Sequence, residues 1–250
     1  MRVIVLGSGS KGNSTLLIGN NKKILIDVGF SYPKMIELLK NYDLKPSDID
    51  AVLVTHTHKD HIAGLSSFLK KNMIPVYTNE LMYDDLIKNI KIDTTIVNED
   101  DFDIDEFKIN VIHTSHDAKG SVGYVISNNK SSLVYITDTG YINKSFLMKM
   151  TNKNIYIFES NHDIGMLMTG PYPYVLKQRV VSDRGHLSNE QAGNYLKELI
   201  GDKTKKIILA HLSEINNTPD IALKTVKAII GDKIEIETAY QNDSLDIGEI

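Results

Sequence analysis

Residues 55–61 read Thr-His-Thr-His-Lys-Asp-His and directly follow an apolar run at residues 51–54. Three imidazoles and a carboxylate this close together indicate metal binding, because neutral imidazole is the commonest nitrogen ligand of zinc-like ions and a carboxylate adds an oxygen donor. His56 and His58 are two residues apart, so an extended backbone brings both to the same side of the chain. Two ligand groups in one segment predict two metal ions, and hence a hydrolytic centre.

A helix is predicted directly after this motif. Apolar residues recur with helical spacing between residues 62 and 69, so the helix begins near Asp60 and His61 and runs to about residue 71. The ligands then lie on a strand-to-helix turn, a usual place for binding residues in α/β folds. In the alternative interpretation Asp60 only caps the helix and the histidines line a polar loop. A cap explains one residue, however, and leaves three imidazoles unexplained.

Length and composition limit the class of protein. The chain has 250 residues and no linker-like or low-complexity tract, which predicts a single domain over residues 1–250. No apolar stretch approaches the ~18 residues of a membrane span and no signal-peptide core is present, so we expect a soluble, cytoplasmic protein. Because the sequence has no cysteine, any metal must be held by histidines and carboxylates. The net charge of −4 argues against coating nucleic acid through bulk electrostatics and leaves local binding open.

Hydrophobic patterns predict early strands linked by hairpins, followed by strands that alternate with helices, and therefore mixed sheets covered by helices. Ser188 with Gln191 forms a capping box, and Thr218-Pro219 marks a second helix start. Gly201 and Gly231 are predicted to end those two helices. Strands are expected at about residues 2–6, 14–19, 23–28, 51–55, 75–78, 107–114, 122–127, 131–137, 155–159, 206–210 and 234–238, and helices at about 32–41, 62–71, 79–89, 143–150, 188–200 and 219–230.

The glycine-rich segment at residues 7–12, Gly-Ser-Gly-Ser-Lys-Gly, matches a dinucleotide-binding pattern, and Asp27 lies twenty residues beyond Gly7. A helix should follow the third glycine of such a site. Residues 14–27 instead alternate apolar runs with a turn, which predicts a hairpin and argues against a nucleotide cofactor. We expect this loop to offer backbone N–H groups, Lys11 and hydroxyls to an anionic substrate.

Further candidate ligands stand near the ends of later apolar strands. His116, Asp138 and His211 each come close after such a strand, and ligands from distant segments meet if these strand ends converge on one edge. His113 is the rival of His116 for the third histidine position.

The histidine motif, followed by a lone histidine, a lone aspartate after a strand and a final histidine, is similar to the metallo-β-lactamase superfamily. The resemblance spans nearly the whole chain, including Asp27, and it implies an α/β fold in which four layers form an αββα sandwich with a binuclear site at its edge. It also implies a set of ligands. His113 has no matching role and is interpreted as a structural or supporting residue. One metal would be held by His56, His58 and His116, the other by Asp60, His61 and His211, with Asp138 bridging.

Residues 7–14, 159–163 and 185–189 together look like the YycJ/WalJ branch of that superfamily, whose members are regarded as 5′-to-3′ exonucleases acting on DNA. The position of His186 before a helix also resembles that of the histidine that RNase Z pairs with a glutamate, here Glu159. The chain lacks an obvious tRNA-gripping arm, which argues against RNase Z itself.

The resemblance implies a metal-dependent phosphodiesterase in which a hydroxide bridging two zinc or manganese ions attacks the substrate. Catalytic roles are predicted for Asp60, which orients the hydroxide, and for His186, which Glu159 orients toward the phosphate or the leaving oxygen. Tyrosines and cations interleave at residues 171–179, where they either contact DNA or pack locally. The predicted substrate-binding residues are Tyr172, Tyr174, Lys177, Arg179, His162 and Asn13, of which His162 is divided between substrate contact and a supporting role.

Three alternatives stay open. The first is a small-molecule thioesterase or lactonase of the same fold, because the same centre attacks carbonyl carbon as well as phosphorus. The second is an RNA-processing nuclease, although DNA is favoured over RNA. The third is a non-catalytic scaffold, against which the complete ligand set argues. The absence of an export signal argues against β-lactam hydrolysis, and the oligomeric state is not predicted.

Overall fold

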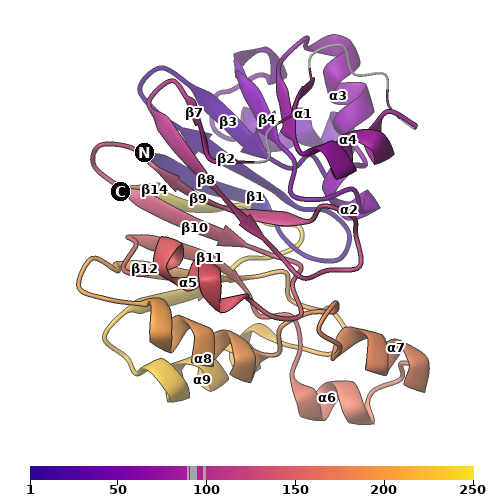
Figure 1. Ribbon diagram of the computed structural model, residues 1–250, viewed down its shortest axis with the longest axis vertical. Helices are drawn as coiled ribbons and strands as arrows, with labels where there is room; N and C mark the ends of the chain where they lie inside the picture. Colours follow the sequence, from indigo (N-terminus) through magenta and orange to yellow (C-terminus); the bar gives the residue numbers. More distant parts are fainter. Residues whose placement is uncertain (89, 91–94, 98–99) are drawn as a thin grey trace.

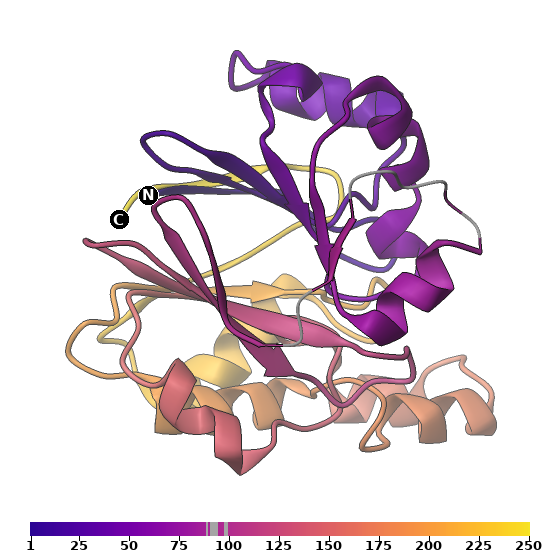
Figure 2. The ribbon, with the colours of Figure 1, turned by 45° about the horizontal axis from the view of Figure 1, so that its top comes forward.

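Two β-sheets face each other and helices cover their outer surfaces, in a computed structural model that describes residues 1–88, 90, 95–97 and 100–250 (Figure 1). Viewed along the sandwich, the order of layers is helices, sheet, sheet and helices (Figure 2). The predicted αββα sandwich is therefore confirmed. No helix within the described part of the chain is long and apolar enough to cross a membrane.

Within the described residues, each sheet has seven strands and combines an antiparallel half with a parallel half. The first sheet runs in the order β14 (Leu245–Glu249), β1 (Arg2–Gly7), β2 (Ser14–Ile18), β3 (Lys23–Ile26), β4 (Ala51–Leu53), β5 (Val76–Thr78) and β6 (Thr95–Val97). The second runs in the order β13 (Glu235–Thr238), β12 (Lys206–Ala210), β11 (Ile155–Glu159), β10 (Ser132–Ile136), β9 (Val122–Ser127), β8 (Phe107–His113) and β7 (Phe102–Ile104).

The helices divide between the two outer faces. The first sheet carries α1 (Tyr32–Lys40), a short turn at Pro46–Asp48, α2 (Lys59–Ile62), α3 (Leu65–Lys71) and α4 (Glu80–Leu86). The second carries a turn at Lys144–Phe146, α5 (Leu147–Met150), α8 (Asn189–Leu199) and α9 (Pro219–Ile230). Two further helices, α6 (Ile164–Thr169) and α7 (Tyr174–Val180), project beside one end of the second sheet (Figure 1).

Alternation along the strands builds two cores. In β10, Leu133 and Tyr135 belong to the core shared by both sheets, whereas Val134 and Ile136 pack with residues of α8 and α9. Successive side chains of a strand point to opposite faces, so one apolar strand serves both cores. The near-continuous apolar runs of the central strands follow from this double burial.

The predicted turns and helix ends that depend on neighbouring residues in the sequence are present in the structure. The hairpin predicted from the glycine-rich segment is β2–β3, which pairs antiparallel from Thr15 opposite Ile26, so the predicted hairpin is confirmed. Ser188 accepts a hydrogen bond from the Gln191 N–H in a capping box. Gly231 follows α9 with a φ of 83°, a conformation that suits glycine.

The prediction of a single helix at about residues 60–71 is wrong in one respect, because the structure has two helices there, α2 and α3. The N–H of Gly64 donates to the carbonyl of Val28 at 2.9 Å, and the carbonyl of Asp60 accepts from the N–H of Asn13 at 2.8 Å. Gly64 also lies so close to Phe30 that an added Cβ would be 1.8 Å from its carbonyl oxygen. Tertiary contacts therefore replace the helical bond at this point.

Other departures from prediction are short elements. The sequence patterns missed β6, β7, β14, α6 and α7, and the last of these lies in the segment at residues 171–179 where tyrosines and cations interleave. The helix expected at 79–89 ends at Leu86 in the structure, and residue 89 lies outside the described residues. The helix expected at 143–150 consists of a short turn followed by α5. Elements this short carry little periodicity.

Candidate metal centre

The ends of several strands converge on one pocket of about 320 Å³. The histidine motif follows β4, His116 follows β8, Asp138 follows β10 and His211 follows β12. His58, Asp60, His116, Asp138 and His211 all line the pocket. The predicted convergence of strand ends is thus observed.

Three residues around this centre leave their strands in a left-handed conformation. Asp27, Asp138 and His211 have φ values of 61°, 55° and 55°. Non-glycine residues adopt this region at a cost of about 1–3 kcal/mol, and they stay there only where surrounding contacts fix them. All three are buried and hydrogen-bonded or ion-paired to other members of the site. The backbone is therefore held in place to aim these side chains inward.

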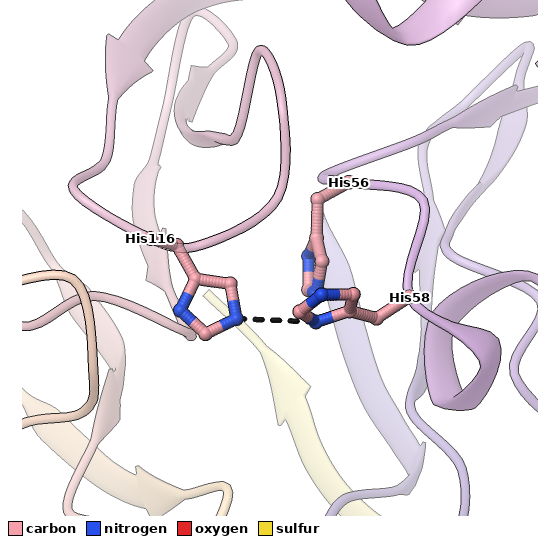
Figure 3. A group of neighbouring side chains, drawn as sticks. All are labelled: His56, His58 and His116. Atoms are coloured by element: carbon pink, nitrogen blue, oxygen red, sulfur yellow. Dashed lines mark hydrogen bonds between the residues drawn. The ribbon is translucent and has the colours of Figure 1, made fainter. Parts of the chain in front are cut away.

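His56, His58 and His116 form the first cluster, and their rings face one another across the gap between two loops (Figure 3). His58 Nδ1 lies 3.2 Å from His116 Nε2. His116 Nδ1 lies 3.1 Å from the carbonyl oxygen of Gly185, and donation to that oxygen leaves Nε2 as a lone-pair donor toward the cluster. Burial lowers the pKa of both His56 and His116, which keeps their imidazoles neutral as metal ligation requires.

Asp60, His61 and His211 form the second cluster. Asp60 Oδ2 lies 3.6 Å from the Nε2 atoms of both histidines. His61 Nδ1 lies 2.7 Å from Asp27 Oδ2, so the buried Asp27 carboxylate fixes the ring and turns Nε2 toward Asp60. Burial alone would lower the pKa of His61, but the carboxylates of Asp27 and Asp138 prevail and raise it to about 10, so a metal ion would have to displace the Nε2 proton as it binds.

Asp138 lies between the two clusters. Its oxygens are 3.1 Å from His61 Nε2, 3.7 Å from His116 Nε2 and 3.5 Å from His211 Nδ1. Burial works to raise the pKa of Asp138, but the surrounding histidines, first among them His211, hold it well below its usual range. The carboxylate therefore stays ionised and carries the negative charge at the centre of the site.

The residues present fit divalent metal ions. His56 Nε2 and His211 Nε2 are buried and have no hydrogen-bond partner among the described residues, and Asp138 Oδ2 lies 3.1 Å from His61 Nε2. Buried polar atoms without partners are costly, and a cation placed between such nitrogen and oxygen donors would satisfy them together. The donor set of imidazoles and carboxylates suits divalent ions.

The predicted pairing of His186 with Glu159 is present, since His186 Nδ1 lies 2.8 Å from Glu159 Oε1. Glu159 is fully buried and also accepts hydrogen bonds from the N–H groups of Thr139 and Leu187, while its Oε1 lies 3.1 Å from His211 Nδ1. Burial raises and His186 lowers the pKa of Glu159, and the net result is a pKa of about 2. One ionised carboxylate thus orients both histidines.

The predicted substrate-binding residues of the α7 segment separate into two groups. Tyr172 and Arg179 line the pocket, and Arg179 Nε donates to Asp117 Oδ2 at 2.6 Å. Lys177 Nζ instead donates to the carbonyl of Met168 at 2.7 Å, and Tyr174 is 74% exposed on α7. Neither of these two residues lines the pocket, so a role in it is not supported for them.

Asn13 and His162 require correction as substrate contacts, because both are buried and neither lines the pocket. The Asn13 amide holds the glycine-rich loop through both backbone groups of Gly9 and lies 3.0 Å from His61 Nε2. His162 lies beneath the start of α8, where its carbonyl accepts from Asn189, and burial lowers its pKa to about 4. The Asn13 side chain therefore supports the glycine-rich loop and His61.

Sequence reasoning missed two charged residues of the pocket wall. Asp117 Oδ1 lies 3.3 Å from His58 Nε2, and Arg184 Nε donates to the carbonyl of His116 at 3.3 Å. Asp117 directly follows His116, and Arg184 stands two residues before His186, so these positions could have indicated that both residues lie near the site. The rival ligand His113 is exposed and packs against Phe146, with ring centroids 5.8 Å apart. Lys11, expected to face a substrate, is paired with Glu214 at 2.6 Å.

An αββα sandwich with histidines and carboxylates clustered at one edge defines a metal-dependent hydrolase. A family model described as a beta-lactamase superfamily domain matches residues 22–212. The chain is 38% identical over 238 residues to exodeoxyribonuclease YycJ of Bacillus anthracis, covering 92% of this chain and 89% of that protein. It therefore belongs to the metallo-β-lactamase superfamily and, within it, to the YycJ/WalJ branch.

Further comparisons agree with this assignment. Exodeoxyribonuclease WalJ of Streptococcus pneumoniae is 37% identical over 234 residues, which cover 89% of this chain and 85% of that protein. Among solved structures, the metallo-β-lactamase fold protein YhfI from Bacillus subtilis superposes with a TM-score of 0.77 at 21% identity, covering 98% of each chain. The short form of human tRNase Z superposes with a TM-score of 0.68 at 16% identity, covering 100% of each chain. At these identities the two structures show the shared fold alone.

Proposed function

We propose that this protein is a 5′-to-3′ exonuclease that hydrolyses DNA at a centre of two divalent ions, zinc or manganese. The observation that carries the proposal is the Glu159–His186 pair, in which His186 lines the pocket and the fully buried Glu159 holds both His186 and His211. The exodeoxyribonuclease activity named for the relatives in Bacillus anthracis and Streptococcus pneumoniae supports DNA as the substrate.

The proposed ligands follow the two clusters. His56, His58 and His116 hold one ion, Asp60, His61 and His211 hold the other, and Asp138 bridges them. Because residues from both sheets contribute to each ion or to the bridge, we propose that residues 1–250 act as one domain.

The bound ions would neutralise the phosphodiester and acidify a water molecule. In the hydrolysis, the water oxygen forms a bond to phosphorus, the P–O3′ bond breaks, and O3′ gains a proton. Asp60 is half-buried at the pocket and orients the attacking water. When both of its ring nitrogens carry a proton, His186 donates Nδ1–H to Glu159 and Nε2–H to the phosphate or to the leaving O3′. The Arg184 side chain in the pocket wall adds a cation near the phosphate.

The direct test incubates metal-reconstituted protein with 5′-labelled and 3′-labelled DNA and RNA, each single-stranded and double-stranded. We expect mononucleotides to be released progressively from the 5′ end of DNA, and the Asp60→Asn variant to be inactive. Absence of cleavage on every nucleic acid would refute the proposal. Cleavage of RNA alone would replace it with an RNA-processing nuclease, and release from the 3′ end would reverse the polarity.

Replacing His186 by alanine should lower kcat by about 100-fold, within the range of contributions from positioned proton-transfer groups. Metal content and KM should stay close to those of the wild type, because His186 belongs to the wall beside the ligand clusters. The measurements are steady-state kinetics and elemental analysis of the purified variant. His113→Ala is the matched control, since His113 is exposed and packs on Phe146. Loss of metal from His186→Ala would show that His186 is a ligand.

A further inference from the structure

One side of the pocket is apolar, in contrast to the ligand clusters. Tyr172, Leu176 and Val180 line it, and Leu176 and Val180 are four residues apart on α7, so they share one helix face. Val180 is buried, whereas Tyr172 and Leu176 are half-buried. These side chains form a wall that a flat apolar group could contact.

A buried amide adjoins this wall. Asn216 also lines the pocket, is only 1% exposed, and its Oδ1 has no hydrogen-bond partner among the described residues. An added Cβ on Gly170 would lie 2.8 Å from that oxygen, which places the amide beside the segment that leads into Tyr172. A buried amide without a partner loses hydrogen-bonding free energy unless a ligand supplies the partner.

Charge indicates which part of a nucleotide belongs here. Arg179 faces the same pocket, but Asp117 pairs with its Nε and terminal nitrogen at 2.6 and 2.5 Å. The guanidinium is thereby neutralised, so this side favours an uncharged group over a second phosphate. Small-ligand pockets hold roughly 300–1,000 Å³. At about 320 Å³ the present one has room for about one nucleotide.

We propose that Tyr172, Leu176, Val180 and Asn216 form a subsite for one nucleobase, that of the terminal nucleotide whose phosphodiester is cleaved. This inference rests on the proposed nuclease function. A nucleobase has the required chemistry, because its faces stack on aromatic and apolar side chains and its edge pairs with an amide that both donates and accepts. The amide and the wall lie next to each other, so one planar base can use both.

The test compares the binding of two probes to the metal-loaded protein, deoxyadenosine 5′-monophosphate and 2-deoxyribose 5-phosphate, the second of which carries a hydroxyl in place of the base. Calorimetry should show that the wild type binds the nucleotide about tenfold more tightly. Tyr172→Ala and Asn216→Leu should each reduce this preference to about threefold or less, with the affinity for the sugar phosphate unchanged. Tyr174→Ala is the matched control, because Tyr174 is an exposed tyrosine two residues further along the chain that does not line the pocket.

A second measurement replaces the base at the 5′-terminal nucleotide of the DNA with an abasic sugar. The wild type should cleave this end about tenfold less efficiently, expressed as kcat/KM, and Tyr172→Ala should lose that discrimination. Equal binding of both probes by the wild type, or a preference that survives in Tyr172→Ala and Asn216→Leu, would overturn the subsite. Cleavage of ordinary DNA by the wild type is measured in a separate assay. If the wild type cleaves DNA but shows no preference for the base, only the subsite is refuted. Absence of DNA cleavage refutes the proposed function, and with it a subsite defined by the cleaved nucleotide.

Discussion

Asp138→Ala is expected to abolish nuclease activity, with a loss of more than about 1,000-fold in kcat/KM, and to empty the proposed metal centre. Asp138 lies within 3.7 Å of nitrogen atoms of His61, His116, His186 and His211, so it contacts both ligand clusters. Without its charge, ions held by the remaining donors would lose the carboxylate that we propose as their bridge. Removing one preorganised electrostatic group commonly costs about 100- to 1,000-fold in rate, and the loss of metal adds to that.

The experiment measures metal content by elemental analysis and DNA hydrolysis on 5′-labelled substrate. Asp246→Ala is the matched control, because it makes the same aspartate-to-alanine change at a surface residue that pairs with Arg2. The Asp138→Ala protein should unfold at the same temperature as the metal-free wild type. This comparison separates loss of metal from loss of fold. An Asp138→Ala protein that retains two ions and most of its activity would contradict the assignment of Asp138 as the bridge.

The residues of the two candidate clusters could be predicted because most of them stand beside a strong local signal, whereas their division between two ions came from the resemblance to the superfamily. The motif at residues 55–61 follows an apolar strand, and the same pattern marks Asp138 and His211. Parallel strands place their carboxyl ends at one edge of a sheet, so a correct strand assignment already gathers these side chains. The structure brings them within a few ångströms of one another, as the resemblance to the superfamily implied.

The supporting contacts of the site could not be predicted in the same way, because they join segments far apart in the sequence. Nothing near Asn13 indicates that its amide reaches His61, and nothing near Gly185 indicates that its carbonyl accepts from His116. The break between α2 and α3 has the same origin, since Val28 supplies the acceptor for Gly64. Such contacts depend on the packing of loops, and the local hydrophobic pattern carries no information about it.

In several of the proposed ligand histidines, the ring nitrogen that points away from the proposed ions is held by an oxygen atom of the protein. His61 Nδ1 is held by Asp27, His116 Nδ1 by the carbonyl of Gly185, and His211 Nδ1 by Glu159. In each case the bond sets the tautomer and leaves Nε2 toward the proposed ions. Glu159 performs this function for His186 as well, so one buried carboxylate couples the metal centre to the pocket wall.

Asp27→Ala is expected to cause the second large effect, on both folding and metal binding. Asp27 is fully buried, and its carboxylate accepts from the N–H and hydroxyl of Thr55 at 2.8 and 2.7 Å as well as pairing with His61. Burial raises the pKa of Asp27, so the ionised carboxylate is costly in isolation and depends on these partners. Removing one member of a buried pair costs about 3–5 kcal/mol, because the other members are left without a partner.

The same substitution should weaken metal binding by about 10- to 100-fold, the usual effect of losing a carboxylate that orients a ligand histidine. Chemical denaturation of the metal-free protein measures the first effect, and metal titration at a temperature where the variant is folded measures the second. Asp27→Asn preserves the volume and an acceptor for the Thr55 N–H, so it should lie between the wild type and Asp27→Ala in both measurements. If Asp27→Ala bound metal as tightly as the wild type, His61 would keep its orientation without the carboxylate, and the geometry at the second cluster would have another cause.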